Sequence, residues 1–419
     1  MVRRSLVHSG LLALFFAVTA SNRPQAQEVL GLGDLPGGTT RSYALGVSAN
    51  GSVVVSYSYS ASGLEAFRWT DGDKMVSLGD LPGGSVFSIA NAVNADGTVV
   101  VGYGENAVGY IAFRWTQESG LSPLGDLSGG KIYSVANAVS ADGSVVVGVS
   151  ESENGNEAFR WTRDSGMVGL GGLDGATFYS EARGVSADGS VIVGWSNSAS
   201  GEEAFRWTAS DEKMIGLGDL DGGSFRSRAN AVSTDGKVIV GFSNSDNGKE
   251  AFRWTEADGM VGLGDLPDGV FESDALAVNA DGSVIVGEGS SAKGIEAFVW
   301  TQADGMKALS EVLTEKGVDV GDWTLSSATG VSGDGMVIVG YGTDENGNTT
   351  AYIATLGARS GGGSDPGITT PEDLAASLTS GTAPAQQSQR AVTTTLNWSL
   401  FAATNTVPVA PTPQLASAD

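Results

Sequence analysis

One unit of about 46 residues recurs along this chain, and no other feature of the sequence restricts the fold as strongly. A complete copy contains residues 136–148, then 157–162, then 166–170. The tryptophan of the Phe-Arg-Trp-Thr element marks the copies at intervals of 46, 46, 46, 47 and 46 residues, at Trp69, Trp115, Trp161, Trp207, Trp254 and Trp300. A fixed period of this length with strand-like segments is typical of β-propellers and solenoids.

Each unit predicts four short β-strands. The first contains small residues, the second is an apolar Val-Val-Val-Gly run, and the third is Glu-Ala-Phe-Arg-Trp-Thr, with Phe and Trp on one face. A fourth strand and a Pro-Gly-Gly connector complete the unit. An Asp-Gly or Asn-Gly pair between the first two strands predicts a type I′ hairpin turn. Seven such pairs occur, at Gly51, Gly97, Gly143, Gly189, Gly236, Gly282 and Gly335.

The two ends of the repeat region are complementary. The seventh unit lacks a fourth strand, whereas residues 28–35 form an unattached fourth strand before the first unit. A ring uses this strand to remove an exposed sheet edge. We therefore predict an all-β fold, namely a closed seven-bladed β-propeller of four-stranded blades that is closed by the N-terminal strand. Extra residues within 309–323 predict a short helix with Leu309, Val312 and Leu313 on one face.

The segments outside the repeats have a different character. Residues 1–26 are predicted to be a signal peptide, since two arginines precede a short apolar run, and cleavage after Ala20 or after Ala26 fits equally. The repeat region spans residues 28–357. Residues 358–370 form a Gly/Ser linker, and residues 371–419 are a low-complexity tail that we expect to be mostly disordered and partly helical.

Composition excludes several kinds of function. The chain has no cysteine, and its one histidine, His8, lies in the predicted signal peptide, so triad catalysis and His- or Cys-based zinc sites are excluded. The net charge is −25, which opposes binding to nucleic acid. No cofactor, metal ligand or transmembrane segment of the mature chain is expected. Acidic loops such as residues 151–157 resemble weak Ca²⁺ ligands without the EF-hand spacing, so Ca²⁺ remains an alternative.

The positions at which the units differ are the candidates for function. An unvarying serine occurs in each first strand, and the residue before it varies, which predicts a ligand-binding set of Arg41, Phe87, Tyr133, Tyr179, Arg226 and Glu272. The three aromatic residues would form a stacking arc for a sugar or an extended peptide. The alternative is that these rings only fill the mouth of a central channel. The recurrent arginine of Phe-Arg-Trp-Thr is expected to pair with acids of neighbouring units.

The repeated elements, Val-Ser-Ala-Asp-Gly-Ser-Val-Val-Val-Gly, Glu-Ala-Phe-Arg-Trp-Thr and Met-Val-Gly-Leu-Gly-Asp-Leu, resemble the HAF-type repeats of bacterial extracellular proteins over residues 28–357. Glu-Ala-Phe or Ile-Ala-Phe stands here in place of the family's His-Ala-Phe. The resemblance implies the passenger region of a Gram-negative autotransporter or a secreted relative, without a translocator barrel in this sequence. It implies no catalytic residues.

These observations predict an exported protein, located outside the cell, at the outer-membrane surface or in the periplasm. We predict a non-catalytic module that binds an extracellular glycan or protein, and no catalytic residues. One alternative is a carboxylate-based glycan-active enzyme, for which Glu272 and the insertion residues Glu311, Glu315, Asp319 and Asp322 are the candidate acids. The other alternative is a purely structural surface protein. Ligand identity and oligomeric state are left open.

Overall fold

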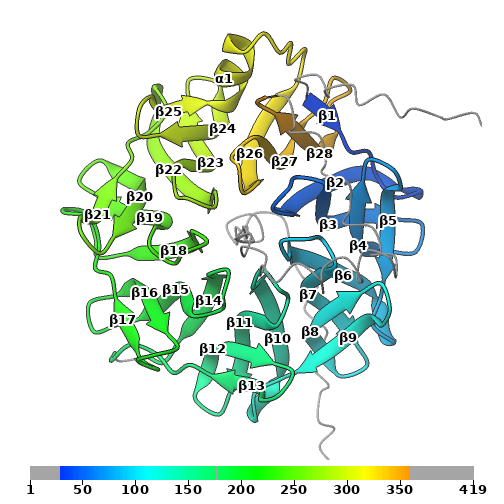
Figure 1. Cartoon of the computed structure of the whole chain (residues 1–419), viewed down its shortest axis with the longest axis vertical. Helices are drawn as coiled ribbons and strands as arrows, with labels where there is room; N and C mark the ends of the chain where they lie inside the picture. The colour runs from blue at the N-terminus through cyan, green and yellow to red at the C-terminus, as the bar shows by residue number, and fades with distance from the viewer. Residues whose placement is uncertain (1–28, 176, 358–419) are drawn as a thin grey trace, which may run out of the picture.

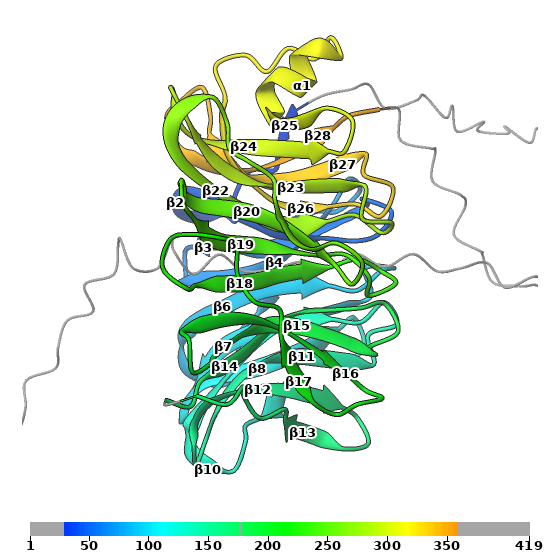
Figure 2. The same ribbon diagram turned by 90° about the vertical axis from the view of Figure 1, so that its left-hand side faces the viewer.

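The computed structural model describes residues 29–175 and 177–357 and has a β-propeller architecture, with groups of antiparallel strands arranged around a common centre (Figure 1). The signal peptide, linker and tail expected from the sequence lie outside these residues. The side view in Figure 2 shows the strands crossing the width of the molecule. In the described part, 28 strands and one helix, α1 (Leu309–Glu315), are present, and no helix is long and apolar enough to cross a membrane.

The strands follow a fixed order within each unit. The innermost strands are β2 (Gly37–Val47), β6 (Gly83–Val93), β10 (Gly129–Val139), β14 (Ser180–Val185), β18 (Ser227–Val232), β22 (Asp268–Val278) and β26 (Thr324–Val331). The second strands are β3 (Val53–Ser60), β7 (Val99–Asn106), β11 (Val145–Ser152), β15 (Val191–Asn197), β19 (Ile239–Ser245), β23 (Val284–Ser291) and β27 (Val337–Thr343).

The third strands carry the Phe-Arg-Trp-Thr element or its equivalent. They are β4 (Leu64–Thr70), β8 (Gly109–Thr116), β12 (Gly155–Thr162), β16 (Glu202–Thr208), β20 (Gly248–Thr255), β24 (Gly294–Thr301) and β28 (Thr349–Thr355). The outer strands are β5 (Lys74–Gly79), β9 (Gly120–Gly125), β13 (Gly166–Gly169), β17 (Met214–Gly216), β21 (Gly259–Gly262) and β25 (Gly305–Ala308). The N-terminal strand β1 (Val29–Gly31) pairs with β28.

The Asp-Gly turns do not have the predicted type I′ geometry. In the third unit, the amide of Gly143 donates to the carbonyl of Ser140, so Ala141 and Asp142 are the central residues. Only Gly143 among these has a positive φ, of 73°. The Asp142 carboxylate accepts from the amide of Ser144 at 2.9 Å, and this bond holds the aspartate in an ordinary conformation. Glycine therefore supplies the one left-handed residue that the turn needs.

The hydrophobic core consists of clusters between successive units. One cluster joins Val99 and Ala112 of the second unit to Val146 and Phe159 of the third. Phe159 is completely buried, as are the equivalent phenylalanines of the first to sixth units. Burial of each such ring stabilises the fold by about 2–3 kcal/mol. Neighbouring units are thus held together by apolar contact rather than by disulfides.

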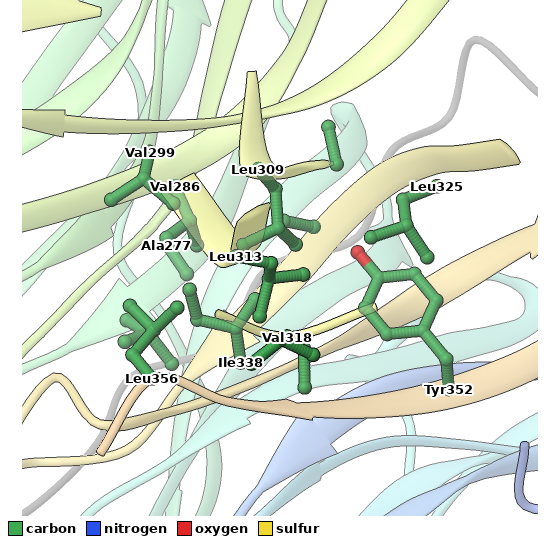
Figure 3. Close-up of a cluster of buried hydrophobic side chains, with 14 residues drawn as sticks. Ala277, Val286, Val299, Leu309, Leu313, Val318, Leu325, Ile338, Tyr352 and Leu356 are labelled. Atoms are coloured by element: carbon green, nitrogen blue, oxygen red, sulfur yellow. The ribbon is translucent and has the colours of Figure 1, made fainter. Parts of the chain in front are cut away.

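The predicted short helix is present and extends the last of these clusters. Leu309 and Leu313 of α1 are fully buried and pack with Val318 and Tyr352 (Figure 3). This insertion covers the outer edge where the sixth and seventh units meet (Figure 1).

The first and last strands of the described region lie side by side. Val29 of β1 pairs with Ala354 of β28, and the amide of Leu32 donates to the carbonyl of Ala351 at 2.9 Å. The hydroxyl of Thr329 donates to the carbonyl of Ala44 at 2.7 Å, which links the innermost strands of the last and first units.

A further set of backbone hydrogen bonds joins the Asp-Gly turns of successive units. Each amide donates to the carbonyl of the equivalent residue in the next unit, at distances of 2.9 to 3.2 Å. The bonds run Ala49 to Ala95, Ala95 to Ala141, Ala141 to Ala187, Ala187 to Thr234, Thr234 to Ala280, Ala280 to Gly333, and Gly333 back to Ala49.

Two of the recurrent arginines contact the backbone of the next unit, and none of the five forms an ion pair with an acid of a neighbouring unit among the described residues, so the expected pairing is wrong. Arg68 Nε donates to the carbonyl of Gly97, and Arg114 Nε to that of Gly143, both in the turn of the next unit. The turn aspartate is engaged by its own turn, and the glycine carbonyl accepts from the arginine instead. Arg253 does form an ion pair, at 3.8 Å, but with Asp258 of its own unit.

Candidate functional site

The six candidate residues lie at one end of the innermost strands, here called the variable face. Phe87 pairs in parallel with Leu64, Tyr133 with Tyr110, Glu272 with Lys249, and Arg226 with Glu202. Each of these pairs joins an innermost strand to the third strand of the preceding unit. The loops between second and third strands emerge at the same face, because adjacent strands run in opposite directions.

The unvarying serine explains why this register is kept. Ser134 Oγ accepts the amide of Ala112 at 2.9 Å and donates to the carbonyl of Gly125 at 2.7 Å, so it ties β10 to the preceding unit. The residue before it is therefore held at the same place in each unit. The seventh unit differs, because a β-bulge between Leu325 and Ser327 removes Ser326 from the pairing.

The first three units and the seventh form an aromatic sector of the variable face. Phe87 and Tyr133 pack on a buried cluster that contains Tyr103. The Phe87 ring lies 5.8 Å from that of Tyr103 and 5.4 Å from that of Tyr110. Next to them, Tyr43 stacks on Tyr57 with 4.9 Å between centroids. Phe87 and Tyr133 are half-buried, so both keep an accessible part.

Tyr179 lies outside this cluster and belongs to a second, ionic sector in the fourth to sixth units. Its ring stacks on Trp195 at 4.4 Å, and its hydroxyl donates to Glu181 at 3.3 Å. The expected arc of three aromatic residues is therefore divided. Two of them share one hydrophobic cluster, and the third packs beside a buried carboxylate.

A continuous chain of polar contacts forms the ionic sector. Glu181 and Arg183, each less than 5% exposed, form an ion pair at 3.2 Å. Arg183 also donates to Asn230 at 2.9 Å. Asn230 then donates to Asp274 at 2.7 Å, and Asp274 pairs with Lys249 at 2.9 Å. Each buried carboxylate is thus matched by a cation, as burial of charge requires.

A second group of charges lies nearer the surface. The Glu202 carboxylate contacts both Arg226 and Arg228 at 2.8 Å. Burial raises its pKa, but the hydrogen bond from Arg226 and the charge of Arg228 outweigh this, and the net shift is downward. The Arg228 guanidinium lies 3.9 Å from the centre of the Trp195 ring. Burial and the nearby charge of Arg183 lower the pKa of Arg228.

The two remaining candidates are exposed at the rim. Arg41 Nε donates to the hydroxyl of Tyr43 at 2.7 Å. The backbone amide of Glu272 donates to Asp265 at 2.8 Å. Burial lowers the pKa of Lys249, but the charge of Asp274 and, to a smaller extent, that of Glu272 raise it, and the net shift is upward. The side chains of Arg41 and Glu272 are therefore available to a ligand.

Sequence reasoning missed the most connected residues of the site, Glu181, Arg228 and Asp274. They stand two positions after the candidates, immediately after the unvarying serine, where the first three units have Tyr43, Ile89 and Val135. Alternate residues of a strand share a face, so this second variable column could have been selected by the same rule. The signal was present in the repeat alignment.

The acids considered for catalysis do not form one site. Glu272 lies on an innermost strand, whereas Glu311 and Glu315 lie on α1 at the outer edge (Figure 1), and Glu315 pairs with Lys307 at 2.8 Å. Within the part of the chain that the structure describes, no group of three or more Asp or Glu residues is arranged to hold a metal ion.

No family model and no curated protein matches this chain. Solved structures do match it. A Mycobacterium tuberculosis puromycin-hydrolyzing peptidase is 14% identical, with a TM-score of 0.50 over 73% of this chain and 50% of that one. A structure from a study of two prolyl endopeptidases is 13% identical, with a TM-score of 0.50 over 73% and 47%. The Dos1 propeller is 10% identical, with a TM-score of 0.43 over 79% and 95%. Likeness at this identity concerns the fold alone.

Proposed function

We propose that this chain is an exported, non-catalytic binding protein that recognises an extracellular glycan or peptide on its variable face. The observation that carries the proposal is the division of that face into an aromatic and an ionic sector. Both sectors are built from positions that differ between units, while the scaffold residues around them recur. Variable side chains on a repeated scaffold are typical of a binding surface.

We also propose that the scaffold is a closed ring of seven four-stranded blades. The pairing of β1 with β28 supports closure, because it joins the two ends of the described region. The turn-to-turn hydrogen bonds support it independently, since the bond from Gly333 returns to Ala49. A closed ring fixes the two sectors relative to each other, which preorganises the site.

The chemistry of the two sectors defines the ligand class. Tyr110 is 40% exposed and, with Phe87 and Tyr133, offers ring surface to a sugar or an apolar side chain. Arg226 and Lys249 lie beside carboxylates that already neutralise them, so they can donate hydrogen bonds without a large unbalanced charge. A neutral or partly charged glycan, or a short peptide, fits this combination.

The absence of a catalytic role is part of the proposal. Glu181 accepts contacts from Asn137, Tyr179, Arg183 and Trp195, which occupy both of its oxygens. A carboxylate held in this way is poorly placed to transfer a proton. Turnover of a polysaccharide that is lost in Glu181→Gln would contradict this part of the proposal.

Export is supported by the sequence alone. Two arginines followed by the apolar run of residues 11–20 fit a signal peptide, and the repeats resemble those of extracellular proteins. Expression of the full chain in a Gram-negative host, followed by cell fractionation and mass measurement, tests it. We expect processed protein in the periplasm or the medium, and full-length precursor in the cytoplasm would contradict export.

Glycan and peptide arrays, probed with the purified mature chain, test the binding function. For any ligand found, the double variant Tyr110→Ser/Tyr133→Ser should bind at least tenfold more weakly, because each lost stacking contact costs about 1 kcal/mol. Ile215→Ser is the matched control, since Ile215 is 50% exposed and lies in the outer strand β17. Equal binding by the double variant and the wild type would place the ligand elsewhere, and no array binding at all would favour a purely structural protein.

A further inference from the structure

The face opposite the variable face, here called the turn face, carries two adjoining cavities. It contains the Asp-Gly turns and the turns after the third strands, because strand direction alternates within each unit. One cavity of about 610 Å³ is lined by the Asp142–Val145 turn, by residues 160–164 and by Arg114. The second, of about 830 Å³, shares Arg114, Asp142 and Arg163 with it. Both volumes are in the range of small-ligand sites.

The first cavity is lined by three arginines, Arg114, Arg160 and Arg163, and by three aspartates, yet none of the arginines forms an ion pair with a described residue. Within residues 29–175 and 177–357, no carboxylate lies within ion-pair distance of Arg114, Arg160 or Arg163. Arg160 Nε is buried and has no hydrogen-bond acceptor among the described residues. Burial and the charge of Arg163 lower the pKa of Arg114.

Two of the three acids at this cavity, Asp142 and Asp188, are already engaged in their own turns, whereas Asp164 is exposed and forms no ion pair with the arginines. Asp142 accepts from the hydroxyls of Ser140 and Ser144 as well as the Ser144 amide. Asp188 makes the same three contacts in the fourth unit, with Ser186 and Ser190. Their hydrogen-bonding capacity is directed at the turn rather than at the guanidinium groups. A negatively charged group from outside the protein would therefore find guanidinium groups that are not paired with a carboxylate of the described residues.

The repeated sequence does not account for all three arginines of this cavity. Arg114 and Arg160 belong to the recurrent Phe-Arg-Trp-Thr element, but Arg163 does not, and its side chain is exposed. The equivalent positions in the other units hold Asp71, Gln117, Ala209, Glu256 and Gln302. The third unit alone among these six adds a second arginine next to the first, in a chain whose net charge is −25.

We propose that this cavity binds an oxyanion, such as the carboxylate, phosphate or sulfate group of a small ligand, through Arg160 and Arg163. An oxyanion in the cavity neutralises the guanidinium groups that line it, which no carboxylate of the described residues pairs with. The planar guanidinium matches such groups with two parallel hydrogen bonds. Trp161 also lines the cavity and offers a ring face to a sugar that carries the anion.

Calorimetric titration of the full chain at constant ionic strength tests this site, with inorganic phosphate, sulfate and glucuronate as probes and glucose as the neutral counterpart of glucuronate. We expect saturable binding of at least one anion, weakened tenfold or more in Arg160→Gln/Arg163→Gln. The double variant Arg206→Gln/Arg253→Gln is the matched control, since it removes two recurrent arginines elsewhere and should bind like the wild type. Glucuronate binding tighter than phosphate would identify an acidic sugar, and equal or tighter phosphate binding an inorganic or phosphorylated ligand.

The single variant Arg163→Gln separates binding from folding. Because its side chain is exposed and makes no ion pair, its melting temperature should equal that of the wild type while anion binding falls severalfold. Undiminished anion binding in both Arg163→Gln and the Arg160/Arg163 double variant would overturn the proposal. So would the lack of saturable binding of all three anions to the wild-type chain.

Discussion

At the scale of single residues, the glycine of the Val-Val-Val-Gly strand, which is replaced by Ser56 in the first unit, leaves almost no room for a side chain in the other six units. A Cβ atom on Gly148 would lie 1.9 Å from the carbonyl oxygen of Val135, and the equivalent glycines meet backbone oxygens at 1.9 to 2.0 Å in five other units. Gly148→Ala should therefore destabilise the protein by about 2–3 kcal/mol, since the two strands must separate. Urea unfolding measures this change. Gly72→Ala is the control, because its Cβ meets nothing within 4 Å, and an equal loss there would refute the argument.

Tyr133 gives a second prediction at this scale. Burial, with a smaller effect of the Glu181 and Glu151 charges, raises the pKa of Tyr133 to about 12. The ordinary pKa of tyrosine is about 10, so folding favours the neutral phenol. The resulting stabilisation is fully present below pH about 10 and is lost as the pH rises through about 12. Alkaline titration of tyrosinate absorbance should lose one late step in Tyr133→Phe, and an unchanged curve would contradict the assignment.

The same scale marks the limit of what the sequence could predict. Phe87, Tyr133 and Arg226 were found because the residue before the unvarying serine differs between units. This comparison needs no knowledge of side-chain contacts. That Tyr179 would stack on Trp195 instead of joining the other rings depends on a side chain from a different strand. Such partners follow from the cross-strand register, which period and composition do not specify.

At the scale of elements, strand β1 is the one whose removal has the largest predicted effect. It covers the edge of β28, and the adjacent Leu32 and Leu35 are buried in a cluster with Phe67 and Ile353. Deletion of residues 29–35 should lower the melting temperature by many degrees, because an edge and an apolar surface are exposed together. A synthetic peptide of these residues should restore it, and a scrambled peptide should not. Unchanged stability after the deletion would contradict this role.

The sequence predicted the helix of the insertion correctly but not the type of the hairpin turns. The short helix at 309–315 followed from the spacing of three apolar residues, and its two leucines are buried. The turn type was wrong, because an Asp-Gly pair fits two geometries and the aspartate side chain selects between them through its bond to the following serine. Side-chain hydrogen bonds within a loop decide such cases.

At the scale of the whole molecule, charge is the property that sets the response to conditions. The chain carries a net charge of −25, because 48 acidic residues outnumber 23 basic ones. Added salt should therefore raise the melting temperature by screening self-repulsion, even though it weakens local pairs such as Glu202 with Arg226. Thermal unfolding in low and moderate sodium chloride measures the balance. A melting temperature that falls with salt would mean that the ionic sector outweighs the global repulsion.

The pairing of β1 with β28 also has a mechanical consequence. Val29 lies opposite Ala354, so the two ends of the described region leave the β1–β28 pair at the same end of the strands. A pulling force applied through both ends would act across the ladder, and the hydrogen bonds of an antiparallel pair would break one after another rather than together. A propeller tethered at both ends would therefore open at this seam under a weak load. The same molecule held by only one end would bear no load across it.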